Sequence, residues 1–183
     1  ADYQAYMTDS EKWNLFRQGN DEALSIIYSE NARALYQYGL KLTHDPVIVE
    51  DCIHDLFLDL IRNRKTIGST DNIRFYLFLS FRRKLMKKIG YEKRYSDTGN
   101  DELPFDICFS AEQDLISKEQ EEIRIKALKT ALKSLTPRQK EVIYLRYTKK
   151  MDYPEISRVM DMGVEATRNL VCRAIRSLKE IMN

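Results

Sequence analysis

The sequence has few of the residues that make turns, with only 6 glycines and 4 prolines among 183 residues. All-β sandwiches and barrels need many turns, so this shortage argues against both classes. No apolar run approaches the roughly 18 residues of a membrane span, and we therefore expect no membrane insertion. The three cysteines are odd in number and widely spaced, which fits a reducing cytoplasm better than a disulfide scaffold.

The sequence also lacks the motifs of the common enzyme classes. Neither GxGxxG nor GxxxxGK[ST], the glycine-rich loops that hold nucleotide phosphates, occurs in it. Cys52 and His54 could provide two metal ligands, but no third or fourth ligand stands at a suitable spacing. No nucleophile and base can be paired with any specificity. We expect no enzymatic activity, no catalytic residue, no metal site and no cofactor.

Charge is distributed unevenly along the sequence, although the net charge is only +2. Residues 91–123 hold 10 acidic and 3 basic side chains, whereas residues 124–183 hold 14 basic and 6 acidic ones. A second basic cluster lies within residues 74–88. Two basic surfaces separated by an acidic connector indicate two modules that meet a polyanion. Solvated charged faces without any partner explain these blocks equally well.

Helix-capping signals and hydrophobic periods predict an all-α fold. Helices are expected to start at Thr8, Asn20, Asp45-Pro46, Asn72, Ser110, Thr136-Pro137, Asp152 and residue 164. Residues 90–110 contain two glycines, a proline and many acidic residues, with no helical period. We therefore expect two small helical domains, residues 1–90 and 111–183, joined by an acidic flexible linker over residues 91–110.

The last three expected helices form a helix-turn-helix pattern, with Gly163 in the turn before the final helix. One face of that helix carries an apolar stripe that includes Leu170, Val171 and Ala174. The other face is polar and basic, which predicts contacts with duplex DNA from Arg168, Asn169, Arg173 and Arg176. The alternative is an ordinary amphipathic surface helix.

The helix over residues 73–89 interleaves aromatic and basic side chains on the face opposite its apolar stripe. This composition suits single-stranded DNA, because rings stack on bases and cations follow phosphates. The candidate residues are Tyr76, Ser80, Arg83, Lys84 and Lys87, flanked by Leu77 and Phe81. The alternative is that the aromatic residues belong to the core.

The helix over residues 46–63 has the opposite character. Its polar face is an acidic strip formed by Glu50, Asp51, Asp55 and Asp59, next to the apolar Phe57. DNA would repel this strip, so a functional role requires a basic protein partner. A solvated polar face is the alternative.

Three segments together resemble one known family. They are DPVIVEDCIHDLFLDLI (45–61), YLFLSFRRKLMKKI (76–89) and the C-terminal stretch that begins LTPRQKEVIYLRY and continues YPEISRVMDMGVEATRNLVCRAIRSLKE (135–180). Their order and content resemble the extracytoplasmic-function (ECF) sigma factors of bacteria, the small members of the sigma-70 family. These factors keep only domains two and four, which would correspond to residues 1–90 and 111–183.

The resemblance implies a function and a set of sites. The chain would be an alternative sigma factor that binds core RNA polymerase and directs promoter-specific transcription initiation. The polymerase would dock on Glu50, Asp51, Asp55 and Phe57. The unpaired −10 strand would be bound by Tyr76, Ser80, Arg83, Lys84 and Lys87, and the −35 duplex by Arg168, Asn169, Arg173 and Arg176.

The same resemblance implies a cytoplasmic protein that is monomeric when free and is held inactive by an anti-sigma factor. The alternative function is a stand-alone helix-turn-helix transcriptional regulator, which would need a dimer to read paired half-sites.

Overall fold

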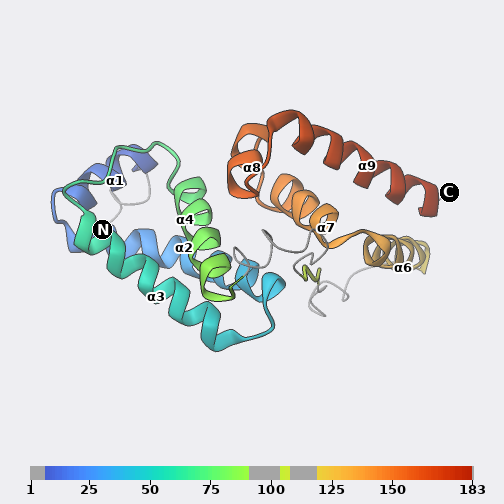
Figure 1. Ribbon diagram of the computed structural model, residues 1–183, viewed down its shortest axis with the longest axis horizontal. Coiled ribbons are helices and arrows are strands. Elements are labelled where there is room, and N and C mark those ends of the chain that lie inside the picture. The colour runs from blue at the N-terminus through green and yellow to red at the C-terminus, as the bar shows by residue number, and fades with distance from the viewer. Residues whose placement is uncertain (1–6, 91–103, 108–118, 183) are drawn as a thin grey trace. The chain divides into compact units, whose positions relative to one another are not determined.

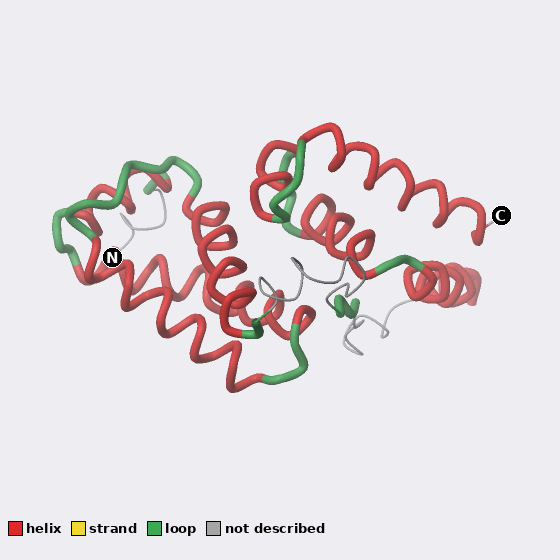
Figure 2. The backbone as a smooth tube through the Cα atoms, viewed as in Figure 1, coloured by secondary structure: helices red, strands yellow, loops and turns green. Residues whose placement is uncertain are grey.

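The computed structural model describes residues 7–90, 104–107 and 119–182. Over these ranges the regular secondary structure is helical, without a strand (Figures 1 and 2). Backbone contacts divide the chain into two compact units, Ala1–Gly99 and Asn100–Asn183, here named the N-terminal unit and the C-terminal unit. The expected all-α fold is confirmed.

Helices α1 (Asp9–Arg17), α2 (Asp21–Leu42), α3 (Pro46–Asn63) and α4 (Ile73–Lys88) build the N-terminal unit. Each starts after a polar side chain that accepts a hydrogen bond from a backbone N–H of the first turn. These caps are Thr8, Asn20, Asp45 and Asn72. Pro46 occupies the first turn of α3, where its missing N–H leaves no helical hydrogen bond unmade. The four expected starts are therefore confirmed.

The core of the N-terminal unit is rich in aromatic residues. Its fully buried members include Trp13, Phe16, Tyr38, Phe78 and Phe81. Helix α2 comes close to α3 and α4 at Gly39, where a Cβ would lie 2.7 Å from Val49 Cγ1 and 2.9 Å from Phe81 Cζ. A larger side chain would force these helices apart, so the close packing of α2 requires glycine at this position.

Helices α6 (Glu119–Ser134), α7 (Pro137–Ile143), α8 (Tyr153–Val159) and α9 (Val164–Met182) build the C-terminal unit. Capping boxes start α7 at Thr136, with Gln139, and α8 at Asp152, with Glu155. A short turn that contains Gly163 connects α8 to α9 (Figure 1). This pair is the expected helix-turn-helix.

The structure differs from the sequence expectation after α7. The backbone continues from Ile143 as a π-helical segment, η3 (Tyr144–Thr148), in place of further α-helix. Lys150 then takes a positive φ of 60°, which ends the helical path before α8. The helix start expected at Ser110 lies outside the described residues.

Four residues of the segment expected to be a linker, 104–107, pack within the C-terminal unit. Phe105 is 2% exposed, and its ring centre lies 5.6 Å from that of Tyr144. Ile107 packs against the cluster formed by Leu132, Leu135 and Ala174. Part of the acidic segment is therefore anchored to the helices that follow it.

Candidate nucleic-acid interface

The solvent-facing side of α9 is polar and basic. The side chains predicted to contact duplex DNA are all exposed on it, namely Arg168, Asn169, Arg173 and Arg176. The opposite side of the helix enters the core through Leu170, Val171 and Ala174. Burial of this apolar side fixes the rotation of α9 about its axis, and therefore holds the four polar side chains outward.

Two neighbouring side chains position Arg168. Its Nη1 lies 2.7 Å from Glu165 Oε1, and its guanidinium carbon lies 5.7 Å from the centre of the Tyr153 ring. The same ring carries the guanidinium of Arg146 at 4.8 Å, and Arg146 Nη1 donates a hydrogen bond to the carbonyl of Met151 at 2.9 Å. Tyr153 therefore gathers two cations through cation–π attraction.

Sequence reasoning missed Arg146, because the η3 segment is what carries residue 146 to the side of α8. By contrast, Asn169, Arg173 and Arg176 have no hydrogen bond or ion pair within the part of the chain that the structure describes. Their donors are available to a ligand. Arginine can bind guanine edges or phosphates, and asparagine can bind adenine edges.

On α4, the predicted residues for single-stranded DNA differ in exposure. Arg83 and Lys87 are exposed, whereas Tyr76 and Ser80 are half-buried. The ring of Tyr76 lies with its centre 5.0 Å from that of Trp13, so α1 supports it from behind. Lys84 is half-buried, and its Nζ lies 2.5 Å from Asp59 Oδ2 on α3. An ion pair therefore already engages this lysine.

The residues expected to flank this face, Leu77 and Phe81, are fully buried. Both belong to the core because α1, α2 and α3 surround α4 on several sides, which a helical wheel does not reveal. The accessible surface of α4 is consequently narrower than the sequence suggests, and Phe81 offers no ring to a base.

The acidic strip of α3 faces solvent at Glu50, Asp51 and Asp55. Phe57 is 7% exposed and packs edge-on against Tyr28 of α2, with ring centres 4.9 Å apart. Phe57 itself therefore offers little surface to a partner, whereas Tyr28, which packs on it, is 49% exposed. Tyr28 is not among the residues predicted from the sequence to contact a partner, because its spacing along α2 indicates an apolar position but not that the position is exposed.

Helices α3 and α4 share two ion pairs that join the acidic strip to the basic face. Besides the contact of Lys84 with Asp59, Lys88 Nζ lies 3.0 Å from Asp51 Oδ2. The hydrogen bond that Lys88 donates to the carboxylate of Asp51 raises the pKa of Lys88 above its usual value. The acidic and basic surfaces are therefore neighbours within one rigid pair of helices.

A groove of about 680 Å³ runs between α2 and α3. Three of the predicted protein-docking residues line it, namely Glu50, Asp51 and Phe57. Its other lining residues are Tyr28, Ala32, Arg33, Tyr36, Ile53 and His54. The groove combines aromatic rings with carboxylates, a lining that fits a protein surface carrying both apolar and basic side chains.

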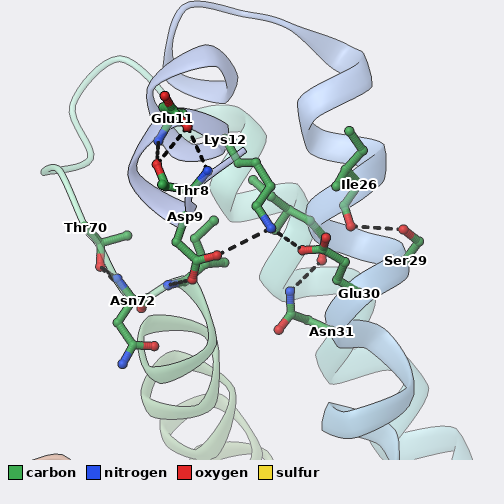
Figure 3. A network of polar contacts seen from close by, with 12 residues as sticks. Thr8, Asp9, Glu11, Lys12, Ile26, Ser29, Glu30, Asn31, Thr70 and Asn72 are labelled. Atoms are coloured by element: carbon green, nitrogen blue, oxygen red, sulfur yellow. Dashed lines mark hydrogen bonds and ion pairs between the residues drawn. The ribbon is translucent and has the colours of Figure 1, made fainter. Parts of the chain in front are cut away.

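A polar network fixes α1 and the 64–72 loop against α4 (Figure 3). Asp9 Oδ2 accepts a hydrogen bond from the backbone N–H of Ile73 at 2.9 Å, and Lys12 Nζ lies 2.6 Å from Glu30 Oε2 on α2. Trp13 Nε1 donates to the carbonyl of Gly68 at 2.8 Å. The loop before α4 is thus held at Gly68, near its middle, and at Ile73, where α4 begins.

Lys12 is the charged centre of this network. Burial lowers its pKa, but the hydrogen bond and charge of Glu30, together with Asp9, outweigh burial, so the pKa of Lys12 is raised. The lysine therefore stays protonated in the folded chain and joins α1 to α2.

The described residues contain no group of three or more His, Cys, Asp or Glu side chains that could hold a metal ion. Burial raises the pKa of the Cys52 thiol, which disfavours the thiolate form that binds metals. Within residues 7–90, 104–107 and 119–182, no helix combines the length and apolar character of a membrane span.

Comparison with known proteins places these surfaces in context. Residues 125–178 match the family model for sigma-70, region 4, which covers most of the C-terminal unit, including α7, α8 and most of α9. A search of curated proteins gave no significant match.

Two solved structures are similar over nearly the whole chain. CnrH, in complex with the cytosolic domain of CnrY, aligns with a TM-score of 0.60 and 18% identity over 95% of this chain and 96% of that one. The sigma factor RpoE from Bartonella quintana, in complex with the anti-sigma factor NepR, aligns with a TM-score of 0.56 and 17% identity. That alignment covers 88% of this chain and 95% of that one.

Proposed function

We propose that the chain is an alternative sigma factor of the sigma-70 family, because residues 125–178 match the model for region 4 and the chain has the two-unit helical fold of CnrH and the sigma factor RpoE. It binds core RNA polymerase and directs it to a specific set of promoters. The observation that carries this proposal is the coincidence of the region 4 match with the exposed basic face of α9.

In this proposal α9 is the recognition helix for the −35 duplex. Arg168, Asn169, Arg173 and Arg176 enter the major groove or contact phosphates next to it. The stacking of Arg168 on Tyr153 supports a role in fixing the register, whereas Asn169 and Arg173 are unengaged within the described chain and are suited to reading bases.

Helix α4 takes the unpaired −10 strand in this proposal. Arg83 and Lys87 are exposed and follow the phosphates, while Tyr76, supported by Trp13, offers part of its ring to a base. Ser80 lies between them on the same face. Lys84 contributes when its contact with Asp59 is exchanged for a phosphate.

Core RNA polymerase docks on α3 through Glu50, Asp51, Asp55 and Phe57. The groove beside these residues accepts apolar side chains of the partner, and the carboxylates pair with its basic ones. Because polymerase binding uses α3 and promoter binding uses α4 and α9, separate substitutions can test each contact.

We also propose an anti-sigma factor as a partner. CnrH is seen with a domain of CnrY, and RpoE with the anti-sigma factor NepR. An anti-sigma factor that covers the α2–α3 groove here would exclude polymerase from the same carboxylates. The proposal places the protein in the cytoplasm as a monomer, with no enzymatic activity of its own and no cofactor.

Co-elution of the purified protein with bacterial core RNA polymerase on a sizing column tests this function. A one-to-one complex that starts transcription from a mapped promoter is expected. Failure to co-elute, with the free protein running as a dimer, would instead favour a stand-alone helix-turn-helix regulator.

A further inference from the structure

A small hollow of about 250 Å³ opens between the end of α1 and the end of α3. It is separate from the three surfaces described above. Its lining residues are Asn14, Arg17, Gln18, Arg64 and Lys65. Three of these five side chains are cationic and none is acidic, so the hollow is suited to an anion.

Arg17 is only half-exposed, and its Nε is buried without a hydrogen-bond partner among the described residues. Buried donors in native proteins are normally paired, so an unpaired guanidinium N–H at the wall of a hollow is unusual. Because this Nε is closed to solvent, a small rotation of the guanidinium would bring its N–H to an anion seated in the hollow.

Arg64 is held in position by the turn between α1 and α2. Gly19 adopts a φ of +97°, and a Cβ built on it would lie 3.5–3.6 Å from the guanidinium atoms of Arg64. The guanidinium therefore lies against this turn, at a distance where even a Cβ on Gly19 would make ordinary van der Waals contact with it. A cation already held in place loses less conformational entropy when it binds a ligand.

No residue that the structure describes neutralises the cations of the hollow. Within the part of the chain that the structure describes, Arg17, Arg64 and Lys65 have no ion-pair partner. The fork-shaped guanidinium matches the oxygens of a phosphate in a bidentate manner, and two arginines with a lysine make a phosphate group the best-matched anion.

The position of the hollow indicates where such a phosphate comes from. Arg17 lies four residues, about one helical turn, beyond Trp13 on the same side of α1. Trp13 in turn contacts both the ring of Tyr76 and the carbonyl of Gly68. The hollow is therefore close to the surface assigned above to unpaired DNA.

We propose that Arg17, Arg64 and Lys65 form a phosphate-binding pocket that holds a phosphodiester of single-stranded DNA passing Tyr76. The assignment of this phosphate to single-stranded DNA rests on the function proposed for α4. The pocket extends the DNA-binding surface of the N-terminal unit from α4 to the ends of α1 and α3.

Binding of a fluorescent single-stranded oligonucleotide to the full chain, measured by anisotropy over a series of salt concentrations, tests the pocket. Arg17→Gln and Arg64→Gln should each weaken binding roughly tenfold. Each should also reduce the slope of log affinity against log salt by about 0.7, as expected for the loss of one phosphate contact on a single strand. Circular dichroism checks that both variants are folded.

Arg62→Gln is the matched control, because Arg62 is exposed in the last turn of α3, two residues before Arg64. Its Nη1 lies 3.9 Å from Asp59 Oδ1, and it does not line the hollow. It should change affinity less than about twofold. Variants of Arg17 and Arg64 that behave like this control, while Arg83→Gln weakens binding, would overturn the pocket and leave the α4 assignment intact.

If the chain binds no single-stranded oligonucleotide, a thermal melt with inorganic pyrophosphate separates the two ideas. A rise in melting temperature that Arg64→Gln abolishes would retain the phosphate pocket and overturn its nucleic-acid source. No rise in the unsubstituted chain would overturn the pocket itself.

Discussion

Tyr144 is a residue whose ionisation is coupled to folding. Its side chain is 6% exposed, and burial raises its pKa to about 12. In the unfolded chain a tyrosine titrates near pH 10. The folded state therefore holds the phenol proton more tightly, so this contribution to stability is complete below about pH 10 and is lost as the pH rises toward 12.

Substitution of Tyr144 by phenylalanine should reduce the alkaline sensitivity of the C-terminal unit. Between pH 9 and pH 11, the Tyr144→Phe variant should lose roughly 1 kcal/mol less of its free energy of unfolding than the unsubstituted chain. Urea unfolding followed by circular dichroism measures this difference. An equal loss in both proteins would show that Tyr144 ionises as readily in the folded chain as in the unfolded one.

Phe105 tests whether the 104–107 segment is part of the folded C-terminal unit. Phe105→Ala removes a ring that is 2% exposed and packs on Tyr144. The cavity and the lost apolar burial should cost about 3 kcal/mol of the free energy of unfolding. Because Trp13 is the single tryptophan and belongs to the N-terminal unit, its fluorescence transition in urea should remain unchanged.

Tyr147→Ala is the control for Phe105→Ala, because the Tyr147 side chain is 51% exposed. It should alter stability by less than about 0.5 kcal/mol. If Phe105→Ala lowered the free energy of unfolding no more than this control, residues 104–107 would contribute nothing to the stability of the C-terminal unit.

At the scale of single elements, helix starts could be predicted from the sequence because capping depends on neighbouring residues. Thr8, Asn20, Thr136 and Asp152 all cap as expected. The burial of Phe81 could not be predicted in the same way. It depends on how many helices surround α4, which is a tertiary property.

The same distinction between local pattern and tertiary packing applies to the candidate surfaces. The outward position of Arg173 follows from the apolar period of α9, whereas the pairing of Lys84 with Asp59 joins residues far apart in sequence. The π-helical segment at Tyr144 has no short-range signal, so its effect on Arg146 was also beyond sequence reasoning.

Helix α9 supplies a prediction that belongs to one element. Arg173→Ala should weaken binding of a duplex containing the promoter's −35 element roughly tenfold, and should lower the salt slope by about 1 if the side chain contacts a phosphate. It should leave polymerase binding unchanged, because the polymerase contact proposed above lies on α3. Anisotropy with a labelled duplex and co-elution with polymerase measure the two effects.

Lys179→Ala is a suitable comparison, since it removes one exposed charge from the same helix outside the predicted set of contacts. A similar loss of affinity for both variants would mean that α9 attracts DNA only by its net charge. A fall in affinity that is the same for every duplex sequence would assign Arg173 to phosphate contact and not to base reading.

At the scale of the whole molecule, the proposed function requires binding of polymerase and promoter at once, and therefore surfaces of opposite charge on one small protein. In the N-terminal unit these surfaces lie on adjacent helices and share the contacts of Asp51 with Lys88 and of Asp59 with Lys84. Solvent reaches and screens both of these partly exposed pairs, so they contribute little to stability. Their carboxylates and ammonium groups can therefore be exchanged for those of partners at small cost.

Asp51→Arg tests this arrangement. Placing a cation where a basic partner surface docks should lower the affinity for core polymerase at least tenfold, because like charges brought together in an interface are strongly unfavourable. Binding of the −35 duplex by α9 should be unchanged. Titration of labelled protein with core polymerase, alongside the duplex assay, measures both affinities.

Lys88→Met separates docking from the ion pair, because it breaks the same contact with Asp51 while it keeps the carboxylate. If Asp51 binds the polymerase directly, Lys88→Met should leave polymerase affinity within about twofold of the unsubstituted value. If the two variants lost affinity equally, the ion pair between α3 and α4, and not the carboxylate itself, would be what polymerase binding requires.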